Sequence, residues 1–242
     1  MNVWLAQWVN SGLGKLGYRI ARVTDRNFSL EAALLRLAQR SVEIETVIDV
    51  GASDSRWTQT VRPFYPNAFF LLIEANLFHE SKLQSYVQRV PMTDFVLAVA
   101  GNQEGKIFFD KSDPMGGIAS SVAQEGYVQL PMTTVDAEVQ RRNLQPPFFL
   151  KLDTHGFEIP ILEGAIQILE QTTLLLIETY NFQIQPHSLR FHEMCTYLET
   201  KGFRPIDIIE PLHRPEDQAL WQFDLLFMRT DRQEFQNNTY TS

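Results

Sequence analysis

The sequence predicts an α/β fold with a Rossmann-like, seven-stranded and mostly parallel sheet. Short runs of β-favouring residues alternate with amphipathic helical segments, which is typical of a parallel sheet covered by helices on both sides. The first such run, 46–50, leads into Gly51 and then into good helix N-cap residues. Three later runs end in carboxylates, which a parallel sheet gathers at one edge. These carboxylates are Glu74, Asp153 and Glu178.

The individual elements follow from the spacing of apolar residues along the chain. Strands are expected at 46–50, 69–73, 95–99, 148–152, 174–177, 204–209 and 223–228. Helices are expected directly after Gly51 and at 77–87, 134–143, 160–169 and 191–198. The last strand follows its predecessor without a helical crossover, so it is expected to run antiparallel.

The pattern divides the chain into a helical arm, a main domain and a polar tail. Residues 1–45 are expected to form an N-terminal helical arm, and residues 46–230 the main domain. Clustered glycines indicate an insertion above the sheet at about 101–131, and residues 231–242 are expected to be a flexible tail. The arm carries six Lys or Arg against four Asp or Glu. We expect it to pack on the main domain or on a second subunit in a homo-oligomer, with membrane or partner contact as the alternative.

The composition is that of an ordinary globular protein, and it excludes several classes. Of 242 residues, 44% are apolar and 21% are charged, and the net charge of −8 gives no electrostatic basis for binding nucleic acid or an anionic membrane. The single cysteine, Cys195, excludes an internal disulfide and a cysteine-rich metal site. Because neither a transmembrane run nor a signal-peptide pattern is found, a cytoplasmic location is expected.

The glycine turn and the acids around it indicate a nucleoside cofactor. Glu74 ends the second strand, where an acid can accept hydrogen bonds from both ribose hydroxyls. A dinucleotide needs several glycines close to its pyrophosphate, and this turn has only Gly51. Asp49 suits a cationic sulfonium cofactor, so these residues favour S-adenosylmethionine over a nicotinamide.

An NAD(P)-dependent reductase remains the alternative enzyme. Tyr197 and Lys201 have the Tyr-x-x-x-Lys spacing of short-chain dehydrogenases. That interpretation requires a glycine-rich cofactor turn in the first strand-helix unit, which the chain lacks. Both residues flank an apolar helical stripe, so we expect them at the edge of the core.

Several ordered motifs of residues 46–229 resemble the FkbM-type methyltransferases. The motifs are Val47-Ile48-Asp49-Val50-Gly51-Ala52 with Thr58, Leu72-Ile73-Glu74, Thr133-Thr134-Val135-Asp136, Leu150-Lys151-Leu152-Asp153-Thr154-His155-Gly156-Phe157-Glu158, Ile161-Leu162-Glu163-Gly164-Ala165, Leu176-Ile177-Glu178 and Phe223-Asp224-Leu225-Leu226-Phe227. The segment 150–158 is the most specific of them. Ser53, Ser55 and His155 depart from the family, which commonly has Asn, Gly and Glu at these places.

The resemblance implies an S-adenosylmethionine-dependent O-methyltransferase with the class I methyltransferase fold. The acceptor it implies is a hydroxyl of a sugar, a glycan or a polyketide-like small molecule. The residues expected to bind the cofactor are Asp49, Gly51, Ala52, Ser53, Thr58, Glu74, Ala75 and Asp153. Because of the departures at Ser55 and His155, a catalytically inactive domain that binds the cofactor or a partner is a further alternative.

The segment after the fourth strand carries the residues expected to act in catalysis. Methyl transfer is an in-line attack on an activated methyl group, so the enzyme supplies alignment, a dry pocket and removal of the hydroxyl proton. Asp153 is expected nearest the methyl group, and His155, whose unperturbed pKa is about 6.5, is the expected base. The alternative is that Asp153, His155 and Glu178 hold a divalent metal that orients a diol, although no metal is expected.

The acceptor pocket is expected to include Glu178 and Tyr180, at the end of the fifth strand. Phe108, Phe109 and Met115 of the insertion are candidates for an apolar wall of this pocket. Simple packing of a hairpin is the alternative explanation for these three apolar side chains.

Overall fold

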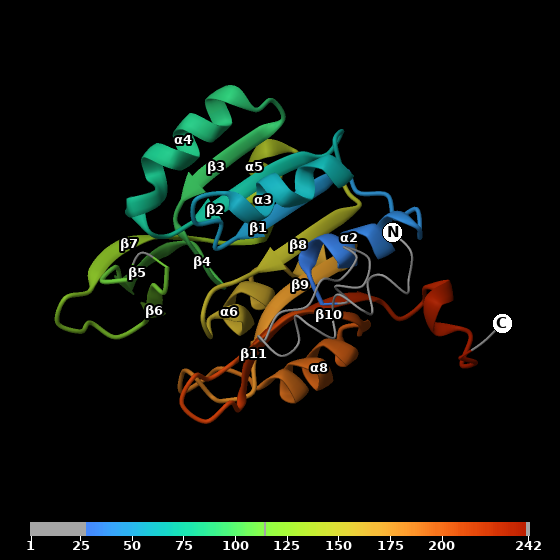
Figure 1. Cartoon of the computed structure of the whole chain (residues 1–242). Helices are drawn as coiled ribbons and strands as arrows, with labels where there is room; N and C mark the ends of the chain where they lie inside the picture. Colours follow the sequence, from blue (N-terminus) through green and yellow to red (C-terminus); the bar gives the residue numbers. More distant parts are fainter. Residues whose placement is uncertain (1–27, 114, 241–242) are drawn as a thin grey trace, which may run out of the picture.

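The computed structural model describes residues 28–113 and 115–240, and its centre is a seven-stranded mixed sheet (Figure 1). The strands are β1 (Thr46–Val50), β2 (Phe69–Glu74), β3 (Thr93–Leu97), β8 (Phe148–Leu152), β9 (Thr172–Tyr180), β10 (Phe203–His213) and β11 (Leu220–Arg229), in the order β10-β11-β9-β8-β1-β2-β3. β1, β2, β3, β8 and β9 pair in parallel, whereas β11 pairs antiparallel with both β9 and β10. The predicted fold class and the antiparallel last strand are confirmed.

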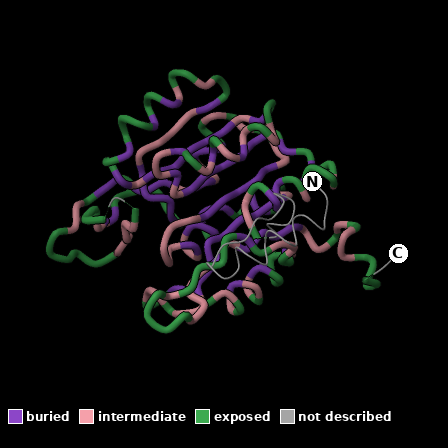
Figure 2. The backbone as a smooth tube through the Cα atoms, in the orientation of Figure 1, coloured by how far each residue is buried: buried purple, intermediate pink, exposed green. Residues whose placement is uncertain are grey.

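The central strands are almost wholly apolar because helices cover both faces of the sheet. Every residue of β1 and β8 is buried, and Figure 2 shows the buried backbone running through the middle of the molecule. The helices that pack on one face are α5 (Val135–Arg142), α6 (Glu158–Glu163), α7 (Ile166–Leu169) and α8 (Phe191–Thr200). Those on the other face are α2 (Leu30–Ala38), α3 (Arg56–Val61) and α4 (Glu80–Arg89). Two apolar cores therefore enclose the sheet.

The helix α2 belongs to the main body of the protein. Ser29 caps it by accepting a hydrogen bond from the N–H of Ala32, and Leu34 and Leu37 are buried in the core of that face. A bidentate ion pair joins Arg36 to Asp207 of β10 at 2.7 and 2.9 Å. The second helix expected in the segment 1–45 is therefore packed on the sheet, and the first one lies outside the described residues.

The predicted insertion contains a second, four-stranded sheet, which lies at the left of the main sheet in Figure 1. Its strands are β4 (Val99–Ala100), β5 (Gly105–Asp110), β6 (Ile118–Ser120) and β7 (Val128–Thr133), in the order β4-β7-β5-β6. Ile107, Phe109, Leu130 and Met132 form a small apolar core of their own. The strand expected at 95–99 is split between the two sheets, since β3 ends at Leu97 and β4 begins at Val99.

Some element boundaries differ from the expected ones. β9 runs on to Tyr180, so Glu178 lies inside the strand and not at its end. The helix expected at 77–87 begins as a 3₁₀ turn, η4 (Leu77–His79), before α4, and a further 3₁₀ turn, η3 (Arg62–Phe64), follows α3. In the segment expected to be a tail, η5 (Gln233–Phe235) places the ring of Phe235 under the guanidinium of Arg204 at 4.8 Å. None of the helices in the described part of the chain has the length and apolar character needed to span a membrane.

Gly164, between α6 and α7, lies in close backbone contact with the connection from β4 to β5. A Cβ at this position would lie 2.0 Å from the carbonyl oxygen of Gly101. We expect Gly164→Ala to lower the free energy of unfolding by about 1–3 kcal/mol, because overpacking forces the backbone to shift. Urea denaturation checks this, with Gln167→Ala, at an exposed position of α7, as the matched control. Equal stability of the two variants would contradict the close contact.

Candidate functional site

The turn after β1 requires a glycine. Gly51 has a φ of +74°, and a Cβ there would lie 1.9 Å from the carbonyl oxygen of Asp153. The N–H of Gly51 donates to the Ile73 carbonyl at 2.9 Å, and the N–H of Asp153 donates to the Val50 carbonyl at 3.1 Å. The ends of β1, β2 and β8 are therefore tied together around this turn.

The two serines of the turn adopt a left-handed backbone conformation. Ser53 has a φ of 49° and Ser55 a φ of 67°. This conformation costs a residue with a Cβ roughly 1–2 kcal/mol, and glycine and asparagine adopt it more readily. Hydrogen bonds hold the turn in this form, since the N–H of Ser53 donates to Glu74 Oε2 at 2.7 Å and Gln59 Nε2 donates to Ser55 Oγ at 3.0 Å.

A cavity of about 330 Å³ lies over the turn, at the carboxyl ends of the parallel strands. The predicted site residues that line it are Gly51, Ser53, Glu74, Ala75, Asp153, His155 and Glu178. Phe109 of β5 and Met115, in the connection between β5 and β6, contribute to its wall, as predicted, whereas Phe108 does not line it. Phe108 and Phe109 differ because neighbouring side chains of a strand point to opposite faces.

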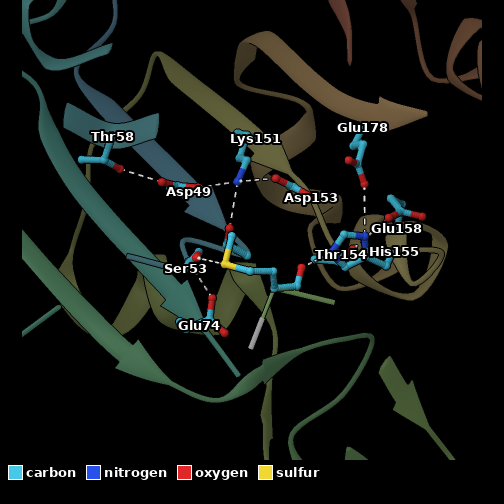
Figure 3. A network of polar contacts seen from close by, with 12 residues as sticks. Asp49, Ser53, Thr58, Glu74, Lys151, Asp153, Thr154, His155, Glu158 and Glu178 are labelled. Carbon is cyan, nitrogen blue, oxygen red and sulfur yellow. Dashed lines mark hydrogen bonds and ion pairs between the residues drawn. The ribbon is translucent and has the colours of Figure 1, made fainter. Parts of the chain in front are cut away.

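Asp49 and Thr58 lie beneath the turn and away from the cavity surface. Asp49 is fully buried and accepts a hydrogen bond from Thr58 Oγ1 at 2.6 Å (Figure 3). The sequence placed Asp49, Ala52 and Thr58 at the cofactor, whereas in the structure none of the three lines the cavity. For Asp49 the reason is strand alternation, because this residue shares its face of β1 with the buried Val47. Ala52 and Thr58 lie beyond β1 and are buried. These residues support the turn from below.

Lys151 was not among the predicted site residues, yet it joins Asp49 to the cavity. Its Nζ donates to the Gly51 carbonyl at 2.8 Å and lies 3.0 Å from Asp49 Oδ1 and 3.3 Å from Asp153 Oδ2 (Figure 3). Burial alone would lower the pKa of this ammonium, but the charges of Asp153 and Asp49 outweigh it and raise the pKa. The sequence did contain a signal for this role, because Lys151 is a charged residue within the otherwise apolar strand β8.

Glu74, the last residue of β2, presents a carboxylate to the cavity at the place predicted for ribose binding. Oε2 accepts from the N–H of Ser53 at 2.7 Å, and Oε1 accepts from the N–H of Asn76 at 2.6 Å. Burial raises the pKa of this carboxyl group, while the two hydrogen bonds oppose the shift. Asn76 also lines the cavity and was not predicted.

Glu178 organises the opposite end of the cavity. Its Oε1 accepts a hydrogen bond from Gln222 Nε2 at 2.5 Å, and its Oε2 accepts one from the Tyr180 hydroxyl. Gln222, which the sequence reading missed, lines the cavity, whereas Tyr180 does not. Burial and the charge of Glu178 hold the pKa of Tyr180 well above its usual range. The hydroxyl therefore stays protonated and donates a hydrogen bond to Glu178.

Both ring nitrogens of His155 are engaged. Nδ1 lies 2.9 Å from the Tyr180 hydroxyl and 3.3 Å from Glu178 Oε2, and Nε2 lies 2.9 Å from the Met115 carbonyl oxygen. The hydrogen bond to Glu178 raises the pKa of His155 to about 9, so the ring is protonated at neutral pH. A protonated imidazole cannot accept a proton, and the structure therefore argues against His155 as the base.

The alternative metal-binding set also comes together. Asp153, His155 and Glu178 can each bring one ligand atom within 4.8 Å of the others. However, a histidine ligand must be neutral and must offer a free nitrogen, and His155 is protonated with both nitrogens engaged. A metal at this place would have to displace the proton of His155 and one of its hydrogen-bond partners.

The cavity does offer the groups that S-adenosylmethionine requires. Glu74 supplies a carboxylate for the ribose, and the stretch 98–100 with Phe157 supplies apolar surface for a flat base. Gly51 permits close approach of the turn, and Asp153 supplies a negative charge for the sulfonium. Neither residue of the rival dehydrogenase spacing, Tyr197 and Lys201, lines this cavity; Tyr197 packs against the core, as expected.

The comparison with solved structures finds several methyltransferases. The methyltransferase FkbM of Methylobacillus flagellatus KT is 16% identical with a TM-score of 0.51, over 75% of this chain and 43% of that chain. This chain thus spans less than half the length of that structure. The N-methyltransferase NodS of Bradyrhizobium japonicum WM9 is 9% identical with a TM-score of 0.47, over 82% and 93% of the two chains. A SAM-dependent methyltransferase of Aquifex aeolicus is 11% identical with a TM-score of 0.41, over 91% and 98%.

The sequence also matches a family model, whereas no curated protein matches the chain. The model describes the methyltransferase FkbM domain and matches residues 49–205, which is more than half of the chain. The matched segment contains the glycine turn, Glu74 and the Asp153–His155 segment that together line the cavity. This match identifies the reaction class as methyl transfer and implies S-adenosylmethionine as the cofactor. The chain belongs to the FkbM methyltransferase family.

Proposed function

We propose that the protein transfers the methyl group of S-adenosylmethionine to a hydroxyl oxygen of a sugar, a glycan or a polyketide-like small molecule. One observation carries the proposal. The Asp153 carboxylate lines the cavity directly beside the Gly51 turn, and its side chain is 39% exposed. A carboxylate in that position can face the methyl donor and accept the proton of a hydroxyl acceptor.

The cofactor would be held by residues at the ends of β1, β2 and β4. Glu74 would accept hydrogen bonds from the ribose hydroxyls, and the Gly51–Ser53 turn would contact the amino-acid part. Val99 and Phe157 would contact the adenine ring. When bound, S-adenosylmethionine supplies an already activated methyl group, so the protein needs to provide alignment and exclude water.

On the acceptor side, Asp153 takes the role of base or orienting group, and His155 takes a supporting role. Lys151 and His155 outweigh the effect of burial and hold the pKa of Asp153 below its usual range, so this carboxylate is charged and can accept a hydrogen bond from the acceptor hydroxyl. His155 holds Glu178 and the Met115 backbone in place. Gln222, bonded to Glu178, offers a neutral amide to the acceptor.

The partner expected for this site is therefore a neutral small molecule or a glycan. The net charge of −8 gives no reason to expect nucleic acid. A cytoplasmic location and a homo-oligomer formed through the N-terminal arm also remain predictions.

The reaction is tested with S-adenosylmethionine that carries a ¹³C-labelled methyl group. We expect calorimetry to detect binding of S-adenosylmethionine and S-adenosylhomocysteine but not of NADPH. We expect NMR of reactions with a panel of glycosides and polyketide-like alcohols to find the label on an ether oxygen. Label on nitrogen or carbon would contradict O-methylation, and binding of NADPH alone would contradict methyl transfer.

Glu74 can be tested by binding alone, since its contribution does not depend on the acceptor. We expect Glu74→Gln to weaken S-adenosylhomocysteine binding about tenfold, because hydrogen bonds from the ribose to a charged carboxylate are stronger than those to a neutral amide. Glu80→Gln, on the exposed side of α4, is the matched control and should bind as the unchanged protein does. If folded Glu74→Gln bound S-adenosylhomocysteine with unaltered affinity, Glu74 would not contact the cofactor.

The protonated state of His155 predicts a pH dependence of stability. Because the folded pKa is about 9 and the unfolded one about 6.5, the stabilisation is complete below about pH 6.5 and disappears as the pH rises through 9. We expect the stability advantage of the unchanged protein over His155→Gln to shrink by about 1–3 kcal/mol between pH 6 and pH 10. Urea denaturation at several pH values checks this, with His187→Gln as an exposed control. A difference independent of pH would mean that His155 is neutral.

A further inference from the structure

The contacts of Lys151 do more than stabilise the fold. It is 4% exposed, and its one ammonium group contacts three acceptors on different parts of the site. These are Asp49 inside β1, the carbonyl of Gly51 in the turn, and Asp153 at the end of β8. Of the three, Gly51 and Asp153 line the cavity and Asp49 does not. Lys151 therefore links a buried anion to the part of the cavity where the cofactor would be held.

The groups joined by ion pairs around Asp153 carry one negative charge in excess. The carboxylates of Asp49, Asp153 and Glu178 face the cations Lys151 and His155. A further acid, Asp224 of β11, stands opposite Glu178 in the sheet. Burial, together with the charges of Asp153 and Glu178, raises the pKa of Asp224 to about 8, so it is mostly protonated at neutral pH. Together with Glu74 at the other end of the cavity, this excess makes the site negative, which suits a cationic sulfonium.

Without Lys151, Asp153 would stand beside Glu178 with less compensation. Two neighbouring carboxylates in a partly buried site cannot both stay charged and in place, so one of them takes up a proton or moves away. His155 contacts Glu178 directly at 3.3 Å, whereas Lys151 is the cation that contacts Asp153, at 3.3 Å. The position and the charge of the Asp153 carboxylate therefore depend on Lys151.

We propose that Lys151 is a positioning residue that makes the site prefer the sulfonium form of the cofactor: by holding the charged Asp153 carboxylate at the cavity surface, it makes S-adenosylmethionine bind more tightly than S-adenosylhomocysteine. The inference rests on the proposed function, since it requires that the cavity binds these two molecules. The two ligands differ by one methyl group and one positive charge. A carboxylate held in place therefore attracts the cationic S-adenosylmethionine more strongly than the neutral S-adenosylhomocysteine. The consequence is easy release of the neutral product after each turnover.

The test compares calorimetric Kd values of the two ligands for three proteins. These are the unchanged protein, the double variant Asp49→Asn/Lys151→Met and the single variant Asp153→Asn. The double variant removes one positive and one negative charge, so the net charge of the site is unchanged. Replacing both members of a buried ion pair is tolerated better than replacing one, and the amide oxygen introduced at position 49 can still accept a hydrogen bond from Thr58. Circular dichroism and thermal melting establish that each variant is folded.

We expect the unchanged protein to bind S-adenosylmethionine more tightly than S-adenosylhomocysteine. In the double variant, the ratio of the two Kd values should fall at least about threefold toward one, and Asp153→Asn should give the same result. A purely structural role of Lys151 would weaken both ligands by the same factor and leave the ratio unchanged, which overturns the proposal. A larger ratio in the double variant would also overturn it. If the double variant does not fold, an unchanged ratio of the two Kd values in Asp153→Asn would also overturn the proposal.

The outcome also separates this inference from the proposed function. If the unchanged protein binds neither ligand, the proposed function fails and the inference fails with it. If the unchanged protein binds both ligands and only the expected change in ratio is missing, the proposed function stands and the role of Lys151 is refuted.

Discussion

One buried ammonium group joins the parts on which the site depends. Lys151 Nζ contacts Asp49 on β1, the carbonyl of the Gly51 turn and the Asp153 carboxylate. An isolated charge in this position would cost several kcal/mol in lost hydration, and this applies to Asp49 as much as to Lys151. Each charge is tolerated only because the others are present. The turn expected to hold the cofactor and the carboxylate expected to act on the acceptor are therefore fixed by the same cation.

His155 provides a second link, between the main sheet and the insertion. It connects Glu178 of β9 to the Met115 carbonyl, which belongs to the connection between β5 and β6. A protonated histidine at this position can donate one N–H to Glu178 and the other to the Met115 carbonyl. His155 therefore ties the insertion to the edge of the main sheet that carries the cavity.

The sequence predicted the main sheet because its strands are continuous apolar runs, and it predicted Glu74 and Asp153 because they stand where such runs end. It did not predict that Asp49 lies beneath the turn, because a one-residue step along a strand changes the face to which a side chain points. The second sheet depends on pairing between β5 and β7, which local patterns do not encode. The protonated state of His155 depends on Glu178, which is distant in the sequence.

The site divides into two halves that meet at Asp153. The half at β1 and β2 offers Gly51 and Glu74, which suit a nucleoside, and the half at β9 and β11 offers Glu178 and Gln222. Because Asp153 and Glu178 are both acidic, an anionic acceptor would be repelled from this second half, whereas a neutral hydroxyl can donate a hydrogen bond to either carboxylate. The same negative charge attracts a sulfonium. The negative charge of Asp153 and Glu178 therefore favours a cationic methyl donor and a neutral acceptor together, the pairing that the proposed methylation of a hydroxyl group would use.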